Sequence, residues 1–325
     1  MKRRRTVVLG CTLVLAGVIA SFGWLVVSHY KPFARRVRHE KAVSQLSFSR
    51  DGSRLLSISR AEGRWLLWDV ENPLDMKNGA PLSGGAEGGT LLPGGARGLL
   101  FVATPGARFS QDMALVDLDD DRTIRTLVSH CETDGRGAAS PDAKCLAYPT
   151  HAHEVVLTSG DGSDRTAELK DLPGVRALTF SPDGRTLAIA TEDGLLLRPV
   201  DTAGPPPFKI DSQPLQCVRF SPEGDMVFAC GTGVVLACSV QGRVIWSRGD
   251  MGPSTLEVIP AGWALIIREQ WGTLGLIRAA TGRWIRTLDA PRTTSFTVSR
   301  AKDRIALGYS DGSVEVKRLS DFLSE

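Results

Sequence analysis

A chain of 325 residues with 42% hydrophobic and 23% charged residues has the composition of a folded globular protein, which excludes a disordered chain. The first 42 residues carry nine basic side chains and one acidic side chain, so residues 43–325 carry 30 basic and 35 acidic side chains, a net charge of −5. A domain of that sign repels phosphate backbones, and nucleic acid is therefore excluded as an expected partner.

The N-terminus contains one long apolar segment. After a basic tail at 1–5, residues 6–30 run without a formal charge. About 20 apolar residues in a helix span the hydrocarbon core of a bilayer. Trp24 and Tyr30 lie near one end of the segment, where amphipathic rings prefer the headgroup region. The sequence therefore predicts a single-pass transmembrane anchor over 6–30, followed by a linker at 31–33.

A cleaved signal peptide is the alternative interpretation of this segment, with 18–20 as the cleavage motif. The apolar run continues through 22–27, beyond that motif, which favours an uncleaved anchor. Four basic side chains precede the segment and five follow it, so the positive-inside rule nearly ties. We expect the short tail to stay inside and the rest of the chain to lie on the extracytoplasmic side of the membrane.

Strand–turn–strand units repeat along the rest of the chain. Three of them, 46–59, 178–191 and 218–231, consist of an alternating strand, a turn of the Ser-Pro-Asp-Gly type and a second alternating strand. The turn glycine supplies an unusual backbone angle, while proline and aspartate preset and cap the turn. Counting weaker copies, the residues in the proline position of seven turns are Arg50, Pro93, Pro141, Pro182, Pro222, Pro260 and Arg300. Their spacing of 38 to 48 residues fits the period of four-stranded propeller blades, about 40–45 residues.

Each unit continues into a third strand, and three units show a recognisable fourth. The third strands are expected at 63–70, 113–118, 154–159, 194–200, 233–240, 273–279 and 313–319. Fourth strands, which are more polar, are expected at 122–127, 243–247 and 283–288. Only six residues follow Leu319, so we expect residues 34–41 to supply the fourth strand of the seventh unit and to remove an open sheet edge. The sequence thus predicts an all-β, seven-bladed β-propeller of four-stranded blades over 34–325, preceded by one N-terminal transmembrane helix.

In its repeated turns and strands, the chain resembles the WD-repeat β-propeller family. The matching segments are His39, Phe48–Gly52, Leu67–Val70, Phe180–Gly184 and Phe220–Gly224. In that family a histidine, a serine or threonine, an aspartate and a tryptophan form a structural hydrogen-bonded set within a blade. The resemblance implies such a set only in the first blade, from His39, Ser57 or Ser59, and Trp68, with Glu62 in the aspartate position. The family's usual role as a rigid interaction platform is a weaker implication, because a fold does not fix a function.

Motifs that carry catalysis or bind cofactors were not found. The sequence contains no hydrolase elbow, phosphate loop, zinc-protease motif or calcium loop, so no catalytic, cofactor-binding or metal-binding residue is predicted. The glycines at 84–85 and 88–89 are interpreted as a connection between blades. His151 and His153 could face the same side of a strand as metal ligands, but exposed loop histidines are the preferred interpretation.

The turns between second and third strands should all emerge on one face of the ring. Trp271 lies at the tip of one such turn, where an exposed tryptophan is a candidate anchor for a protein partner. Packing over an adjacent blade is its alternative role. Arg60 and Tyr309 lie in the corresponding turns of the first and last units, next along the closed ring. We therefore predict a protein-binding patch of Trp271, Tyr309 and Arg60.

The function predicted from these features is that of a membrane-tethered, non-enzymatic scaffold or sensor that binds a protein through one propeller face. The alternative is a propeller enzyme or small-molecule binder, quinoprotein-like or lyase-like, that uses the central channel. Catalysis in such a channel requires several histidine, aspartate or arginine side chains. The chain has only five histidines in total, which favours the scaffold.

Overall fold

The computed structural model of the chain describes residues 39–71, 76–78, 86–103, 111–131, 137–150, 152–172, 174–201, 208–269 and 272–324. The chain divides into two compact units, Met1–Val37 and Arg38–Glu325. The predicted anchor at 6–30 lies outside the described residues. Within the described ranges, no helix is long and apolar enough to cross a membrane.

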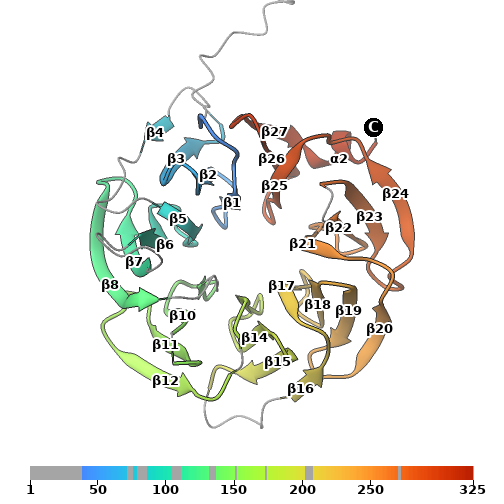
Figure 1. Ribbon diagram of the computed structural model, residues 1–325, viewed down its shortest axis with the longest axis horizontal. Helices are drawn as coiled ribbons and strands as arrows, with labels where there is room; N and C mark the ends of the chain where they lie inside the picture. Colours follow the sequence, from blue (N-terminus) through green and yellow to red (C-terminus); the bar gives the residue numbers. More distant parts are fainter. Residues whose placement is uncertain are drawn as a thin grey trace, which may run out of the picture. The chain divides into compact units, whose positions relative to one another are not determined.

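The second unit is a ring of seven antiparallel sheets, each with its first strand at the centre and its last strand outside (Figure 1). Blade one contains β1 (Gln45–Phe48), β2 (Arg54–Ser59), β3 (Arg64–Asp69) and β4 (Met76–Asn78). Blade two contains β5 (Ala86–Leu91), β6 (Arg97–Ala103), β7 (Gln111–Asp117) and β8 (Arg122–Cys131). Blade three contains β9 (Ala138–Ala139), β10 (Cys145–Pro149), β11 (Val155–Ser159) and β12 (Arg165–Leu169). Blade four contains β13 (Ala177–Phe180), β14 (Thr186–Thr191), β15 (Gly194–Pro199) and β16 (Phe208–Asp211).

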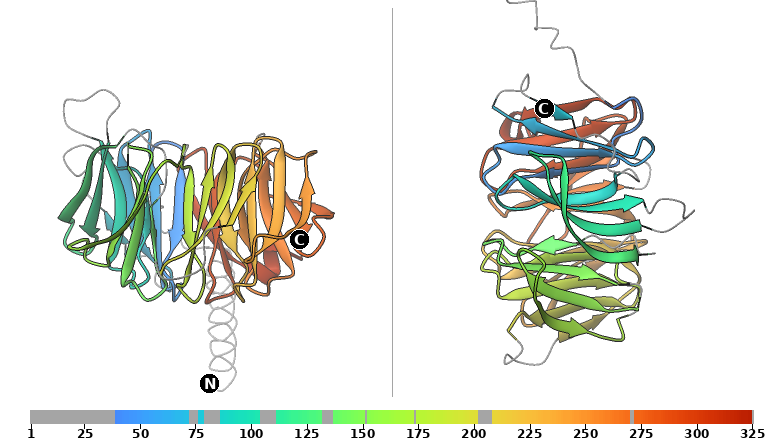
Figure 2. Two further views of the ribbon diagram at one scale, coloured as in Figure 1. Left: turned by 90° about the horizontal axis from the view of Figure 1, so that it is seen from below. Right: turned by 90° about the vertical axis from the view of Figure 1, so that its left-hand side faces the viewer.

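The remaining blades follow the same order, and in side view their strands run from one face of the ring to the other (Figure 2). Blade five contains β17 (Leu215–Phe220), β18 (Met226–Gly231), β19 (Val234–Ser239) and β20 (Val244–Arg248). Blade six contains β21 (Pro253–Val258), β22 (Ala264–Glu269), β23 (Leu274–Arg278) and β24 (Trp284–Leu288). Blade seven contains β25 (Thr293–Val298), β26 (Arg304–Tyr309) and β27 (Val314–Arg318). The predicted seven-bladed architecture is confirmed.

The core lies between neighbouring blades. Successive side chains of a strand point to opposite faces of its sheet, and in the inner strands both faces are buried. In β17, Val218 and Phe220 pack into a cluster shared with blade four, whereas Cys217 packs into a cluster shared with blade six. Apolar side chains of an inner strand such as β17 are therefore buried on both faces of its sheet, while the outer strand β20 exposes Val244 and Ile245.

The turn after the first strand is held by its own side chains in blades one and four. In blade four the Ser181 hydroxyl donates to Asp183 Oδ1 at 2.5 Å and accepts a hydrogen bond from the backbone N–H of Thr186 at 2.9 Å. Gly184 has a φ of +74°, which explains the requirement for glycine. In blade one the corresponding hydrogen bond from Ser49 lowers the pKa of Asp51 to about 2. The motif that reveals the repeat is thus a structural device.

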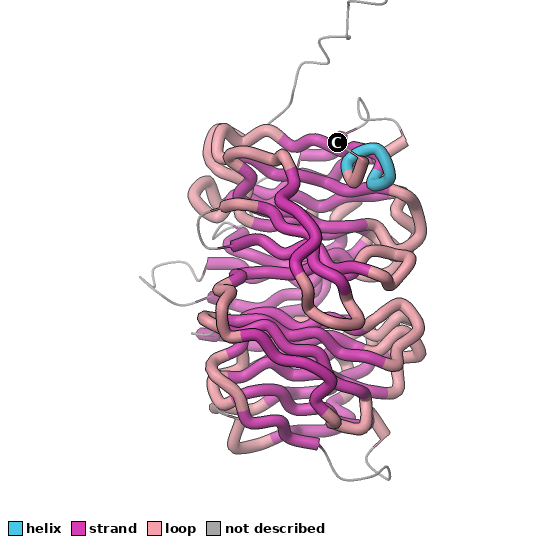
Figure 3. The backbone as a smooth tube through the Cα atoms, turned by 90° about the vertical axis from the view of Figure 1, so that its right-hand side faces the viewer, coloured by secondary structure: helices cyan, strands magenta, loops and turns pink. Residues whose placement is uncertain are grey.

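Blade seven has three strands within the described part of the chain, as expected from the six residues after Leu319. The chain ends instead in the short helix α2 (Leu319–Phe322), which is cyan in Figure 3. Its buried residues Leu319 and Phe322 pack into the cluster shared by blades six and seven. Of the strand expected at 34–41, residues 34–38 lie outside the described part of the chain. Residues 39–41 are not in a strand, so the predicted boundary was too long at that end.

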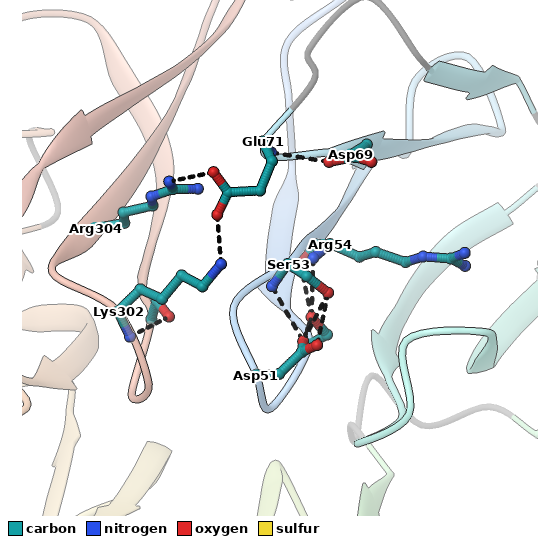
Figure 4. Close-up of polar contacts among 9 residues, drawn as sticks. Asp51, Ser53, Arg54, Asp69, Glu71, Lys302 and Arg304 are labelled. Carbon is teal, nitrogen blue, oxygen red and sulfur yellow. Dashed lines mark hydrogen bonds and ion pairs between the residues drawn. The ribbon is translucent and has the colours of Figure 1, made fainter.

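The ring closes where blade one meets blade seven. The hydroxyls of Thr294 and Ser295 both donate to the backbone carbonyl of Val43, at 2.7 and 2.9 Å. A second contact joins the two blades: Glu71, after β3, contacts Lys302 and accepts a hydrogen bond from Arg304 of β26 at 3.0 Å (Figure 4). These side chains join the first and last described blades directly.

One sequence-based interpretation was wrong at Gly88 and Gly89. These residues belong to β5, the innermost strand of blade two, and do not form a connection between blades. Both glycines let neighbouring groups approach closely: a Cβ at Gly89 would lie 2.5 Å from the Leu99 carbonyl oxygen, and one at Gly88 would lie 3.3 Å from Gln45 Oε1. Gln45 in turn accepts a hydrogen bond from the Gly89 N–H at 3.2 Å. Gly88 therefore admits the blade-one side chain that joins blades one and two, whereas Gly89 admits the neighbouring strand β6 of its own blade.

Candidate protein-interaction face

Every blade has the same antiparallel strand order, so the turns between second and third strands emerge on one face of the ring, here called the interaction face. On this face the segment 39–44 enters blade one beside blade seven. Two backbone hydrogen bonds attach it to blade seven: the His39 N–H donates to the Gly312 carbonyl at 3.0 Å, and the Val43 N–H donates to the Tyr309 carbonyl at 3.1 Å. The entry segment is therefore fastened to the β26–β27 turn.

A buried hydrogen-bonded set fixes the same segment to blade one. His39 is fully buried, and its Nε2 lies 3.0 Å from the Ser57 hydroxyl. The Trp68 indole N–H donates to the same hydroxyl at 2.8 Å. Because the indole can only donate, the Ser57 hydroxyl is free to give its proton to His39 Nε2, which places the ring proton on Nδ1. His39, Ser57, Trp68 and Glu62 are called the blade-one set below.

Glu62 completes the blade-one set from the β2–β3 turn. Its Oε2 lies 3.7 Å from His39 Nδ1, an electrostatic contact beyond hydrogen-bonding distance. Its Oε1 accepts the backbone N–H of Lys41 at 2.5 Å. Burial lowers the pKa of His39 below its ordinary value of 6.5, while the Glu62 charge opposes that shift. A neutral imidazole can therefore accept the Ser57 proton.

Arg60 and Tyr309 lie on the two sides of the entry segment. The backbone N–H of Arg60 donates to the Ser44 hydroxyl at 3.1 Å, next to Val43, which contacts Tyr309. The structure thus places the backbones of both predicted patch residues beside the entry segment, whereas the Arg60 side chain is directed toward blade two and the Tyr309 ring toward blade six. Trp271, the third, lies outside the described residues, in the sequence between β22 and β23.

The Arg60 side chain is 54% exposed and forms an ion pair with Glu87 of blade two at 3.2 Å. Gln111 donates to the same Glu87 oxygen at 2.5 Å. These groups border a cavity of about 270 Å³, lined by Ser44, Gln45, Arg60, Glu87, Gly88, Phe101 and Gln111. Sequence reasoning missed Glu87 and Gln111 because no motif marks them, and Glu87 lies between glycines that suggested a loop.

Tyr309 is half-buried at the end of β26, and its hydroxyl donates to Glu315 Oε2 at 2.8 Å. Burial, together with this hydrogen bond and the negative charge of Glu315, raises the pKa of Tyr309. The phenol therefore remains protonated and holds its hydrogen bond to Glu315 within blade seven. Its ring packs against the cluster between blades six and seven.

Of the two histidines considered as a metal site, only His153 is among the described residues. His151 lies outside the described residues, while His153 is exposed and adopts a φ of +57°. Among the residues whose positions are described, no group of three or more histidine, cysteine, aspartate or glutamate side chains could hold a metal ion.

Comparison with known proteins agrees with the repeat. Residues 166–197 match the family model "WD domain, G-beta repeat". The matched segment begins in β12, the fourth strand of blade three, and ends in β15 of blade four. The sequence repeat therefore crosses a blade boundary. Together, this match and the seven-bladed ring support the resemblance of the chain to the WD-repeat β-propeller family.

A chain of a solved structure described as "Crystal Structure of Mitotic Checkpoint Complex" has the same fold, with a TM-score of 0.68. The similarity covers 87% of this chain and 91% of that chain at 11% sequence identity, a level that shows the fold alone. No curated protein matches the sequence.

Proposed function

We propose that the chain is a non-enzymatic scaffold that is tethered to a membrane and binds a protein partner through its interaction face. The observation that carries this proposal is the rigid junction of blades one and seven. There the blade-one set and the backbone hydrogen bonds of His39 and Val43 hold an entry segment between Arg60 and Tyr309. A surface fixed in advance loses little entropy when it binds, so its contacts contribute more fully to affinity.

The residue types on this face also suit a protein partner. Arginine, tyrosine and tryptophan are the side chains most enriched among residues that dominate binding energies. Arg60 exposes half of its side chain, and Tyr309 offers an aromatic ring with a polar tip. Trp271 would add a large apolar anchor from blade six. The structurally similar chain was itself solved within a complex, which agrees with a role in assembly.

The tether rests on the composition of residues 6–30, which are uncharged over a length sufficient to cross a bilayer. Four basic side chains in the first five residues would hold the short tail on the inner side. The propeller would then lie on the extracytoplasmic side.

Partner capture from detergent-solubilised membranes tests the proposal. Wild type is compared with the double variant Trp271→Ala/Arg60→Ala and with Arg243→Ala, a matched control. Arg243 is an exposed arginine in the β19–β20 turn, which emerges on the opposite face. We expect a protein captured by wild type and Arg243→Ala to be reduced at least tenfold with the double variant at an unchanged melting temperature. Equal capture by all three proteins would contradict the proposal.

A further inference from the structure

The central channel is lined by two rings of side chains that the repeat places at equivalent positions. It encloses about 480 Å³, and the first strand of every blade contributes to its wall. Innermost strands surround this space at the centre of Figure 1. One ring lies three residues before the proline position of each turn and consists of Ser47, Thr90, Ala138, Thr179, Arg219, Glu257 and Thr297.

The second ring is formed at the proline positions themselves. In blades two to five these positions hold prolines that line the channel: Pro93, Pro141, Pro182 and Pro222. Blades one and seven, which are neighbours in the ring, hold Arg50 and Arg300 instead. Proline favours the turn by presetting its backbone, and arginine offers no such advantage. Two adjacent arginines therefore add charge to the channel that the turns do not require.

The positive charge is only partly neutralised within the channel. Arg219 and Glu257 form a bidentate ion pair between blades five and six, at 3.0 and 3.2 Å. Arg50 donates one N–H to the Pro141 carbonyl in blade three. Arg300 has no hydrogen bond or ion pair to any described residue. Three arginines against one glutamate leave two positive charges without an acidic partner.

Arg300, like Arg50, is exposed to solvent in the channel. The channel wall near Arg300 desolvates its guanidinium in part. Burial lowers its pKa; the nearby Glu257 acts against that shift, whereas Arg219 and Arg50 add to it. A solvent-exposed guanidinium with no partner among the described residues is available to an anion that enters the channel.

We propose that the channel binds a small polyanion, such as a phosphate ester or a polycarboxylate, between Arg50 and Arg300. Guanidinium groups bind carboxylate and phosphate oxygens through paired N–H donors. A cleft with walls of low dielectric strengthens attraction to an anion. The volume falls within the range of small-ligand sites, about 300–1,000 Å³. Hydroxyls of the first ring, such as those of Ser47 and Thr90, supply further donors.

Isothermal titration calorimetry on the full chain in mild detergent tests this site, with pyrophosphate and citrate as probes at constant ionic strength. We expect saturable binding of at least one probe at a stoichiometry of one. The probe that binds more tightly distinguishes a phosphate-type from a carboxylate-type ligand. The double variant Arg50→Gln/Arg300→Gln should weaken binding at least tenfold, whereas Arg243→Gln, which removes an exposed arginine outside the channel, should leave it unchanged.

Arg300→Gln alone breaks no hydrogen bond to the described residues, so it keeps the test decisive if the double variant is unstable. Binding of neither probe to wild type, or equal binding to wild type and Arg300→Gln, would overturn the proposal. The partner capture described above does not depend on this site, so the two proposals can fail separately.

Discussion

Replacing Ser57 with alanine removes the hydroxyl on which two members of the blade-one set depend. His39 Nε2 is fully buried and would lose its hydrogen bond, while the Trp68 N–H, in a half-buried side chain, would lose its acceptor. Leaving a buried polar group without a partner costs about 1–3 kcal/mol, with the lower end applying to a group that water can reach. We expect Ser57→Ala to lower the free energy of unfolding by about 2–3 kcal/mol.

Ser59 provides a matched control on the same strand. It is also fully buried and lies two residues further along, on the same face of β2. Its hydroxyl already lacks a hydrogen-bond partner among the described residues. Ser59→Ala should therefore leave stability unchanged or raise it slightly. Thermal unfolding of the full chain in detergent should give a midpoint roughly 4–8 °C lower for Ser57→Ala than for Ser59→Ala. Equal midpoints would refute the structural role assigned to the blade-one set.

Three further predictions concern the termini and pH. If residues 6–30 form an anchor, the full chain should stay in the membrane pellet after high-salt and alkaline washing; a mature N-terminus at Ser21 would instead identify a cleaved signal peptide. If residues 34–38 pair with β27, deleting them should expose a sheet edge and promote aggregation, as measured by melting temperature and light scattering; a deletion variant that matches the full chain in both would exclude this closure. Because burial lowers the pKa of His39 from 6.5, the unfolded state binds more protons than the native state below pH 6.5. The contribution of neutral His39 is thus present above pH 6.5 and lost as pH falls through its folded pKa. His39→Gln should flatten this acid-side loss in urea unfolding, and an unchanged slope would show that other groups cause it.

The blades could be predicted from sequence because their inner strands obey two strong constraints. Segments such as 178–191 combine period-two alternation with a turn that requires serine, aspartate and glycine at fixed positions, and the structure confirms β13 and β14 there. The outer strand β12 was missed. Four of its five residues, Arg165 to Glu168, are not buried, so burial imposes little pattern on it.

The placement of candidate site residues was only partly predictable. His39, Trp68 and Glu62 were expected together from the family resemblance, but only the structure distinguishes Ser57 from Ser59 as the shared acceptor. The arginines at the proline positions of the first and last turns were visible in the sequence. Their convergence in one channel depends on ring closure, which brings together residues separated by almost the whole chain.

The most direct test of the central claim is the affinity of the captured partner for Trp271→Ala. A tryptophan at the tip of a turn exposes a large apolar area, and truncating a true anchor typically costs more than about 2 kcal/mol of binding. We predict that the dissociation constant rises at least roughly tenfold, equivalent to about 1.4 kcal/mol, while the melting temperature remains unchanged. An unchanged dissociation constant together with a large drop in melting temperature would identify Trp271 as a packing residue and contradict binding through the interaction face.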